Sequence, residues 1–155
     1  MRNGDFTLAD PAVRTLAFAA LTVVLALVFG VGLVSSGVLR HLVQTAPCWL
    51  TIYFGFRQND LAKWTMLPVA LFWLAIMIAI WLFLLGWAKI VTGRFTIIEI
   101  VMTMIVGFAS LIAISRAIRI RSRVSWFVGI AVIMLTLGLQ LVAFRLSLLP
   151  GIANR

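Results

Sequence analysis

The sequence predicts an all-α integral membrane protein in which four transmembrane helices form a small bundle. Three observations lead to this fold class. Hydrophobic residues make up 64% of the 155 residues and charged residues only 11%, far from the balance of soluble domains. Four apolar runs each approach the roughly 20 residues that a helix needs to cross a bilayer. They leave no room for a separate soluble domain, so we expect one transmembrane domain over residues 1–155.

The first span is expected at about residues 16–38. Asp10 and Pro11 before it are typical of a helix start, because the carboxylate caps free N–H groups and proline lacks an N–H that would need a partner there. Val34, Ser35 and Ser36 resemble a signal-peptide cleavage site. The apolar run before them is too long for a signal sequence and its leading region contains acidic residues, so we expect the span to be retained.

The connection from Arg40 to Lys63 is the longest one between the expected spans. Its middle, residues 47–56, is apolar and aromatic. About ten residues are too few to cross the bilayer, and Pro47 interrupts any helix that enters this stretch. We therefore expect an interfacial or re-entrant aromatic segment between the first and second spans. A docking surface for a partner and a pore-lining loop are the alternatives.

The second span, at about residues 65–88, has a tryptophan near each end, as helices anchored at both membrane interfaces do. Large side chains surround most of it, so we expect it to face lipid over much of its girth. One narrow face could let another helix approach closely. The small residues that form this face are Ala75, Ala79 and Gly86.

Aromatic residues and one histidine near the span ends are expected at headgroup depth, where amphipathic rings are favoured. These residues are His41, Trp49, Tyr53, Trp64, Trp87 and Trp126. His41 is the only histidine, and one imidazole cannot supply both axial ligands of a haem. Cys48 is the only cysteine, which excludes an internal disulfide or a multi-cysteine metal site. We expect no metal and no cofactor.

The third and fourth spans, at about residues 95–114 and 124–144, each carry a stripe of small and polar residues. Residues three and four apart lie on one face of a helix, so we expect both stripes to face protein. The stripe of the third span is Glu99, Thr103, Gly107 and Ser110, and that of the fourth is Ser125, Gly129, Thr136, Gln140 and Ala143.

Glu99 is the only acidic residue inside an apolar run. A carboxylate costs about 2.5 to 3.5 kcal/mol at the bilayer centre and less toward the interface, so it needs a partner or a proton. In a hairpin of the third and fourth spans, Gln140 lies at the same depth. We expect these two side chains to hydrogen-bond, with Arg94 or Arg145 nearby. The alternatives are a carboxylate that couples proton or ion movement and a contact to another subunit.

A run of four arginines joins the third and fourth spans: Arg116, Arg119, Arg121 and Arg123. So short a link predicts frayed helix ends, with three of the four arginines on one face. We expect these side chains to hold anionic lipid headgroups. Docking onto an acidic partner is the alternative.

The positive-inside rule gives no orientation for a chain with four spans. One side would carry Arg2, Arg14, Lys89, Arg94, Arg145 and Arg155, and the other would carry Arg40, Arg57, Lys63 and the arginine run. The two sides differ by a single charge, as a protein that inserts both ways as an antiparallel dimer would show. We expect both termini on the same side of the inner membrane of a bacterium.

No catalytic constellation stands out. The four acids Asp5, Asp10, Asp60 and Glu99 are scattered, whereas hydrolysis or metal-assisted transfer needs clustered carboxylates. We therefore expect a non-catalytic accessory or structural subunit of a larger membrane complex, which packs through its small-residue helix faces. Its expected partners are lipid and other membrane subunits or copies of itself, with no nucleic acid. The alternative is a small oligomeric transporter or channel that uses Glu99 as a coupling carboxylate.

Overall fold

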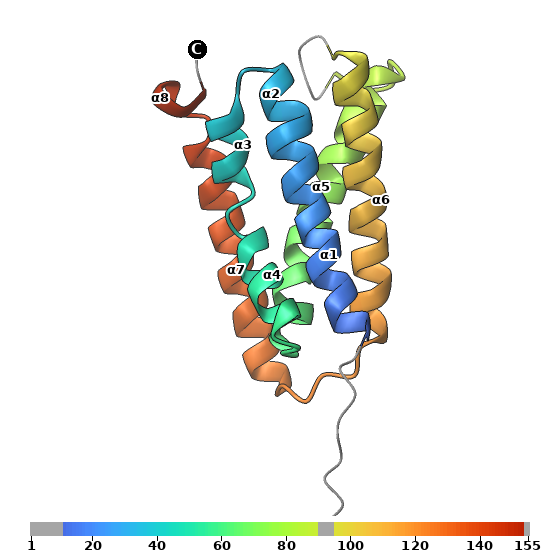
Figure 1. Ribbon diagram of the computed structural model, residues 1–155, viewed down its shortest axis with the longest axis vertical. Helices are drawn as coiled ribbons and strands as arrows, with labels where there is room; N and C mark the ends of the chain where they lie inside the picture. The colour runs from blue at the N-terminus through green and yellow to red at the C-terminus, as the bar shows by residue number, and fades with distance from the viewer. Residues whose placement is uncertain (1–10, 90–94, 154–155) are drawn as a thin grey trace, which may run out of the picture.

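The computed structural model describes residues 11–89 and 95–153, and these ranges are helical apart from short links (Figure 1). The elements are α1 (Pro11–Leu25), the π-helix η1 (Ala26–Val31), α2 (Gly32–Val34), α3 (Val38–Gln44), α4 (Cys48–Phe56), α5 (Leu61–Leu84), α6 (Ile97–Arg119), α7 (Trp126–Leu146) and α8 (Pro150–Ala153). Four rods are long and apolar enough to cross a membrane: Pro11–Val34, Leu61–Leu84, Ile97–Arg119 and Trp126–Leu146. They confirm the predicted all-α fold with four such helices. The expected caps and contacts of Asp10 and Arg94 lie outside the described residues.

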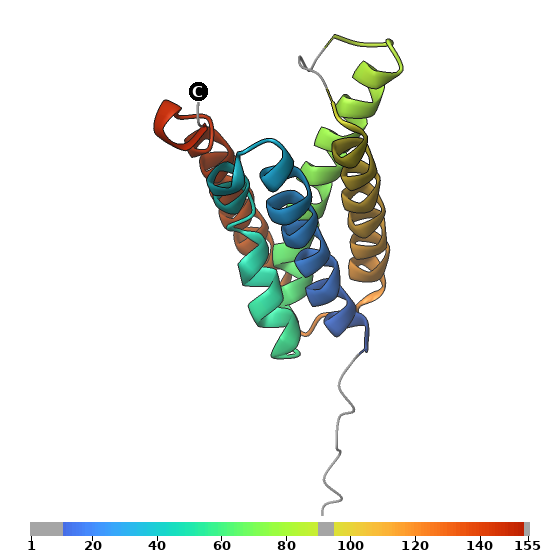
Figure 2. The ribbon, with the colours of Figure 1, turned by 45° about the horizontal axis from the view of Figure 1, so that its top comes forward.

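The segment between the first and second long rods runs along the bundle. Helix α3 lies against η1, α2 and α7, and α4 continues in the same direction against α1 and α5 (Figures 1 and 2). The segment thus lies alongside the long helices, and its expected interfacial or re-entrant position in a membrane stays a prediction. Pro47 interrupts the helix, as predicted, but only for about one turn, because it then serves as the N-cap residue of α4.

With this segment the chain passes along the bundle five times: α1 to α2, α3 to α4, α5, α6 and α7. As a result, α1 begins at one end of the bundle and α7 ends at the other (Figure 1). The expectation of both termini on one side rested on an even number of passes. The expectation itself concerns the sides of a membrane, and it stays a prediction.

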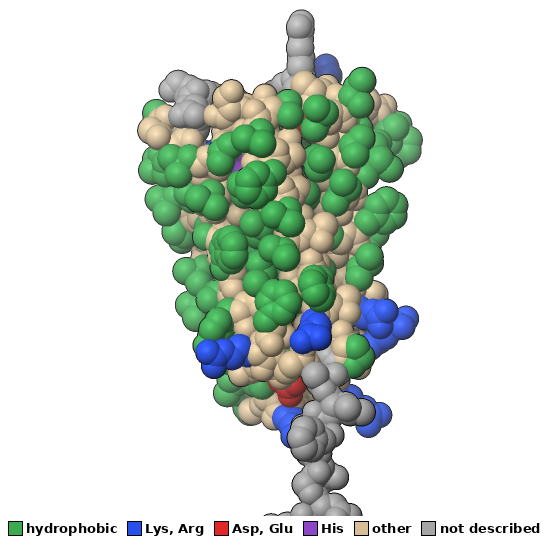
Figure 3. All heavy atoms as spheres, viewed as in Figure 1, with side chains coloured by type: hydrophobic (Ala, Val, Ile, Leu, Met, Phe, Trp, Pro, Cys, Tyr) green, Lys and Arg blue, Asp and Glu red, His purple; other side chains and the backbone are tan. Residues whose placement is uncertain are grey.

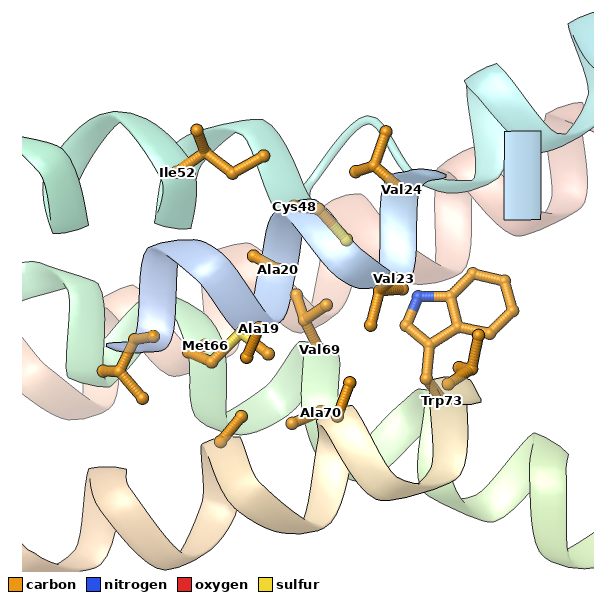
Figure 4. Close-up of a cluster of buried hydrophobic side chains, with 14 of the residues drawn as sticks. Ala19, Ala20, Val23, Val24, Cys48, Ile52, Met66, Val69, Ala70 and Trp73 are labelled. Atoms are coloured by element: carbon orange, nitrogen blue, oxygen red, sulfur yellow. The ribbon is translucent and has the colours of Figure 1, made fainter. Parts of the chain in front are cut away.

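The core lies where α1, α4, α5 and α6 meet. Helices α1 and α4 approach closely, because a Cβ added to Gly55 would lie only 2.7 Å from the Cβ of Ala17. Small residues permit this approach. The labelled core side chains in Figure 4 are Ala19, Ala20, Val23 and Val24 of α1, Cys48 and Ile52 of α4, and Met66, Val69, Ala70 and Trp73 of α5.

Helix α7 packs through four of the five residues of the predicted stripe, whereas the fifth, Ser125, is exposed before the helix begins. Its buried residues are Gly129, Thr136, Gln140 and Ala143, which confirms that this face meets protein. A Cβ at Gly129 would lie 2.6 Å from the indole of Trp64 on α5. Only glycine therefore leaves room for this ring against the helix.

Helix α5 does not pack through the narrow face that was expected. Ala75 is exposed. Gly86 lies beyond the end of the helix, and a Cβ added to it would meet no atom within 4 Å. The contact face instead contains larger side chains that interdigitate with α1 and α6. Its buried members include Met66, Val69, Trp73 and Met77.

Large apolar side chains cover the outside of the bundle over most of its height, and basic side chains gather near the end where α1 begins (Figure 3). Exposed apolar area of this extent is unfavourable in water but matches the hydrocarbon of a bilayer. The surface therefore agrees with a multi-pass membrane protein.

Candidate functional site

The most polar place in the bundle interior is the break between α3 and α4. We call Gln44, Thr45, Gln140 and Ser147 the polar junction. Gln44 and Thr45 end α3, whereas Gln140 and Ser147 belong to the last turns of α7 and its C-cap. All four side chains are buried, with exposed fractions of 3% or less. Buried polar groups need hydrogen-bond partners, so the junction can be checked group by group.

The broken backbone is fully paired. All of the backbone carbonyls from residue 41 to residue 47 accept a hydrogen bond. The Thr45 N–H donates to the carbonyl of residue 41, and the Thr45 hydroxyl donates to the carbonyls of residues 41 and 42. The carbonyls of residues 43, 45, 46 and 47 each accept the N–H of a residue three positions later. The carbonyl of Gln44 is the one that needs a donor from another helix.

Gln140 supplies that donor. Its Nε2 donates to the Gln44 carbonyl oxygen at 3.0 Å. In the other direction, Gln44 Nε2 donates to Ser147 Oγ at 3.0 Å, and Ser147 Oγ donates to the carbonyl of Phe144 at 2.6 Å. Two side chains therefore join α3 to α7 at the break. Gln140 Oε1 is buried and has no hydrogen-bond partner among the described residues.

A second polar contact lies closer to the other end of the bundle. Thr51 of α4 donates from its hydroxyl to the hydroxyl of Thr65 on α5 at 3.0 Å, and both residues are buried. Thr65 in turn donates to the carbonyl of Leu61 one turn earlier. We call residues 38–56, which form α3 and α4, the interrupted pass. Neutral hydrogen bonds thus tie it to α7 at the break and to α5 through α4.

The polar junction consists of neutral amides and hydroxyls, which can hold helices in register but cannot transfer a proton near neutral pH. Within the described ranges, no three His, Cys, Asp or Glu side chains gather as a metal site would require. The arrangement therefore fits structural connection better than acid–base or metal chemistry.

The expected hydrogen bond between Glu99 and Gln140 is not formed. Glu99 Oε2 accepts from the N–H and the hydroxyl of Thr96, at 2.7 and 2.8 Å, while the Glu99 N–H donates to Thr96 Oγ1 at 3.3 Å. This reciprocal pair is a capping box at the start of α6. The carboxylate accepts the N–H and the hydroxyl of the N-cap residue of its own helix, so its partner is local and not on α7.

The other polar residues of the α6 stripe lie in the interior. Thr103 is buried and donates to the carbonyl of Ile100 at 2.7 Å. Ser110 is fully buried, and its Oγ has no partner within the described chain. Gly107 lies beside Met77 of α5. Three members of the stripe thus face α5 or the core, while Glu99 marks the helix end.

The residues that were expected at the membrane interface differ in how exposed they are. Trp49 and Tyr53 are exposed on α4, and Trp87 and Trp126 are exposed near helix ends. Trp64 is instead buried, donates from Nε1 to Ser122 Oγ at 3.0 Å and stacks edge-to-face on Trp126. His41 lies on α3, and its Nδ1 is buried without a partner among the described residues.

The arginine run spans the end of α6 and the link that follows it. Arg116 and Arg119 lie in the last turn of α6, whereas Arg121 and Arg123 belong to the non-helical link. The expected single helical face is therefore interrupted. The link is fixed at three points. The Arg123 N–H donates to Asp60 Oδ2 at 2.7 Å, Lys63 Nζ donates to the Ile120 carbonyl at 2.9 Å, and Ser122 accepts the bond from Trp64.

Two apolar grooves lie on the outer surface. One, of about 380 Å³, lies between α5 and α6 and is lined by residues that include Met77, Trp81, Leu82, Thr103, Gly107 and Phe108. The other, of about 440 Å³, lies between α1, η1 and α6, with Phe29 and Met102 in its lining. Both linings are almost wholly apolar, so they suit hydrocarbon chains or apolar side chains.

Three residues of the polar junction were not anticipated: Gln44, Thr45 and Ser147. One signal was present, since Gln44 is an uncharged amide within the apolar stretch that includes both α3 and α4. The role of Asp60 was also missed, because its partner is a backbone N–H more than sixty positions along the chain.

The fold and the polar junction define a class of protein: a multi-pass helical bundle with four helices apolar enough to cross a membrane. Comparison with models of protein families, with curated proteins and with solved structures finds no match to this chain.

Proposed function

We propose that the chain is a non-catalytic, structural subunit of a larger membrane protein assembly. The observation that carries this proposal is the second half of α5. The buried residues of α5 end at Met77, and in the last two turns Ile78 is exposed while residues 79–84 are half-buried. In Figure 2 the upper parts of α5 and α6 stand away from α3 and α7. The last two turns of α5 hold no fully buried side chain in the described part of the chain, so they leave room for a helix of another chain.

The groove between α5 and α6 supports this proposal. It lies beside the last turns of α5, and Gly107 in its lining leaves room for a large side chain from a partner. Membrane helices associate through close packing at such small residues. The fitting partner is a transmembrane helix of another subunit, with a second copy of this chain as the other candidate.

The polar junction supports the same proposal. In transporters, unwound helices at membrane depth leave carbonyl groups that coordinate ions. Here the carbonyls of the break are all paired within the protein. The capping box at Glu99 likewise gives that carboxylate a local structural partner. A transporter that couples through Glu99 therefore has less support than a structural role. We place the chain in the inner membrane of a bacterium.

Site-specific photo-crosslinking tests the subunit role. A photo-reactive phenylalanine analogue replaces Leu82 in the α5–α6 groove, and the matched control replaces Phe127, which is 83% exposed on α7. We expect an adduct with a different membrane polypeptide at position 82 and none at position 127. A dimer-sized adduct would replace the subunit role with a homo-oligomer. Adducts with lipid alone at position 82 would contradict both.

A further inference from the structure

The interrupted pass is long enough to cross the bilayer. Val38 to Phe56 is about 19 residues, or roughly 28 Å at the helical rise, close to the 30 Å of hydrocarbon in a bilayer. Irregular backbone is tolerated at that depth only where protein satisfies it. The break meets this condition, since its carbonyls are paired and Gln44, Thr45 and Cys48 are buried.

Five passes distribute the basic residues unevenly. Among the described residues, seven basic side chains lie at the end where α1 begins: Arg14, Arg57, Lys63, Arg116, Arg119, Arg121 and Arg123. We call this the basic end (Figure 3). Three lie at the opposite end: Arg40, Lys89 and Arg145. A count with four passes gives the two sides almost equal numbers of basic residues, because it places Arg40 of α3 on the same side as Lys63 at the start of α5.

Basic residues accumulate on the cytoplasmic side of membrane proteins, and the bias is strongest in short links between spans. The links at the basic end are short: residues 57–60 join α4 to α5, and residues 120–125 join α6 to α7. The basic end is therefore the one that the rule assigns to the cytoplasm. The opposite end, where α7 finishes, is assigned to the far side.

The cations of the basic end are not neutralised by the described part of the chain. Asp60 is the described acidic residue there, and its Oδ2 accepts the backbone N–H of Arg123 and not a guanidinium. Lys63 donates to a backbone carbonyl. The side chains of the arginine run are exposed, and the link that carries two of them is held in place by these bonds.

Aromatic side chains lie at the same end. Tyr53 and Trp126 are exposed, and the guanidinium of Arg57 lies 5.1 Å from the centre of the Tyr53 ring. Exposed aromatic rings next to exposed cations are typical of the headgroup layer, where rings meet the glycerol region and cations meet phosphate.

We infer that the chain crosses the membrane five times, with α1 beginning at the cytoplasmic side, and that its basic end binds the phosphates of anionic phospholipids in the cytoplasmic leaflet. This inference does not depend on the proposed subunit role. A chain that works alone would show the same topology and the same lipid preference.

Reporter fusions test the topology. Green fluorescent protein folds on the cytoplasmic side and alkaline phosphatase is active on the other, so each terminus is fused to each reporter in separate chains. We expect fluorescence with the N-terminal fusion and phosphatase activity with the C-terminal one. Fluorescence from both termini, or phosphatase activity at both, would show an even number of passes and overturn the inference. The reversed pattern would overturn the orientation.

Lipid retention tests the basic end. The purified chain is exchanged into mixed vesicles of phosphatidylglycerol and phosphatidylcholine, and bound lipid is counted by native mass spectrometry. Replacing Arg119, Arg121 and Arg123 with glutamine is expected to lower phosphatidylglycerol retention by about fivefold per charge. The control variant combines Lys89→Gln with Arg145→Gln, which alters exposed cations of the opposite end. It should retain phosphatidylglycerol as the unmodified chain does. Equal retention by both variants and the unmodified chain would overturn headgroup binding.

Discussion

Replacing Gln140 with leucine removes the donor that serves the Gln44 carbonyl at the break. The bond is 3.0 Å long, and the two residues are 0% and 3% exposed, so water has no access to replace it. Leaving a buried carbonyl without a donor costs about 1–3 kcal/mol. Leucine has a similar volume to glutamine, so the change leaves little new cavity.

Two effects reduce this cost. The substitution also removes Gln140 Oε1, a buried acceptor without a partner among the described residues. In addition, measured hydrogen bonds between membrane helices average about 0.6 kcal/mol. We expect the Gln140→Leu variant to lose about 1 kcal/mol, which corresponds to about a fivefold rise in the population of the opened break.

Cys48 provides the assay. Its thiol is fully buried beside the break, on the first turn of α4. A maleimide therefore reacts with it only after α3 and α4 open locally. In mild detergent, with reclosing faster than labelling, we expect the Gln140→Leu variant to label about five times faster than the unmodified chain.

Thr136→Val is the matched control. Thr136 lies on the same face of α7, one turn before Gln140, and is 1% exposed. Valine has nearly the same shape, and Thr136 makes no side-chain hydrogen bond within the described residues, so labelling should stay close to that of the unmodified chain. If Gln140→Leu labels no faster than Thr136→Val, the bond to Gln44 does not hold the break closed.

Three further tests use substitutions elsewhere in the chain. Gly55→Ala brings a Cβ into the contact between α1 and α4 and should lower the free energy of unfolding in a detergent titration by about 1–3 kcal/mol. The control Gly138→Ala has open space around it and should not lower this free energy. Equal effects of the two substitutions would contradict the close contact. Glu99→Gln should preserve α6 because glutamine also completes a capping box, while Glu99→Leu should lose about 1 kcal/mol in the same titration; a loss of stability in both would show a need for the charge. Asp60→Ala removes the acceptor of the Arg123 N–H, so trypsin should cut the link between α6 and α7 faster in detergent, and an unchanged rate would show that this bond does not fix the link.

The long helices and one packing face could be predicted from the sequence because both follow from local patterns. Apolar length alone indicates a membrane helix, and the spacing of Gly129, Thr136, Gln140 and Ala143 places them on one side of α7. The capping box was also readable, since Thr96 precedes Glu99 by three residues in the pattern typical of a helix start. The cost of a carboxylate inside a span directed the prediction toward a distant partner instead.

The interrupted pass could not be predicted from the same patterns. Pro47 divides the stretch from Val38 to Phe56 into two runs that are each too short to span. Their alignment depends on bonds that exist only in the folded bundle, above all the one from Gln140 to the Gln44 carbonyl. Every residue has a backbone carbonyl, so the sequence does not indicate which carbonyl Gln140 binds. The sequence could place Gln140 on a protein-facing stripe of α7 but could not name its partner.

The most direct measurement of the five-pass arrangement is the side of the membrane on which each end of the interrupted pass lies. In a chain with Cys48→Ala, the variants Ser35→Cys, Asn59→Cys and Ser125→Cys each place one thiol at an exposed position outside the long helices. A maleimide that cannot cross membranes is then added to intact cells. The arrangement predicts that residue 35 is labelled, whereas residues 59 and 125 react only after the membrane is disrupted. Labelling of residues 35 and 59 from the same side would show that α3 and α4 do not cross.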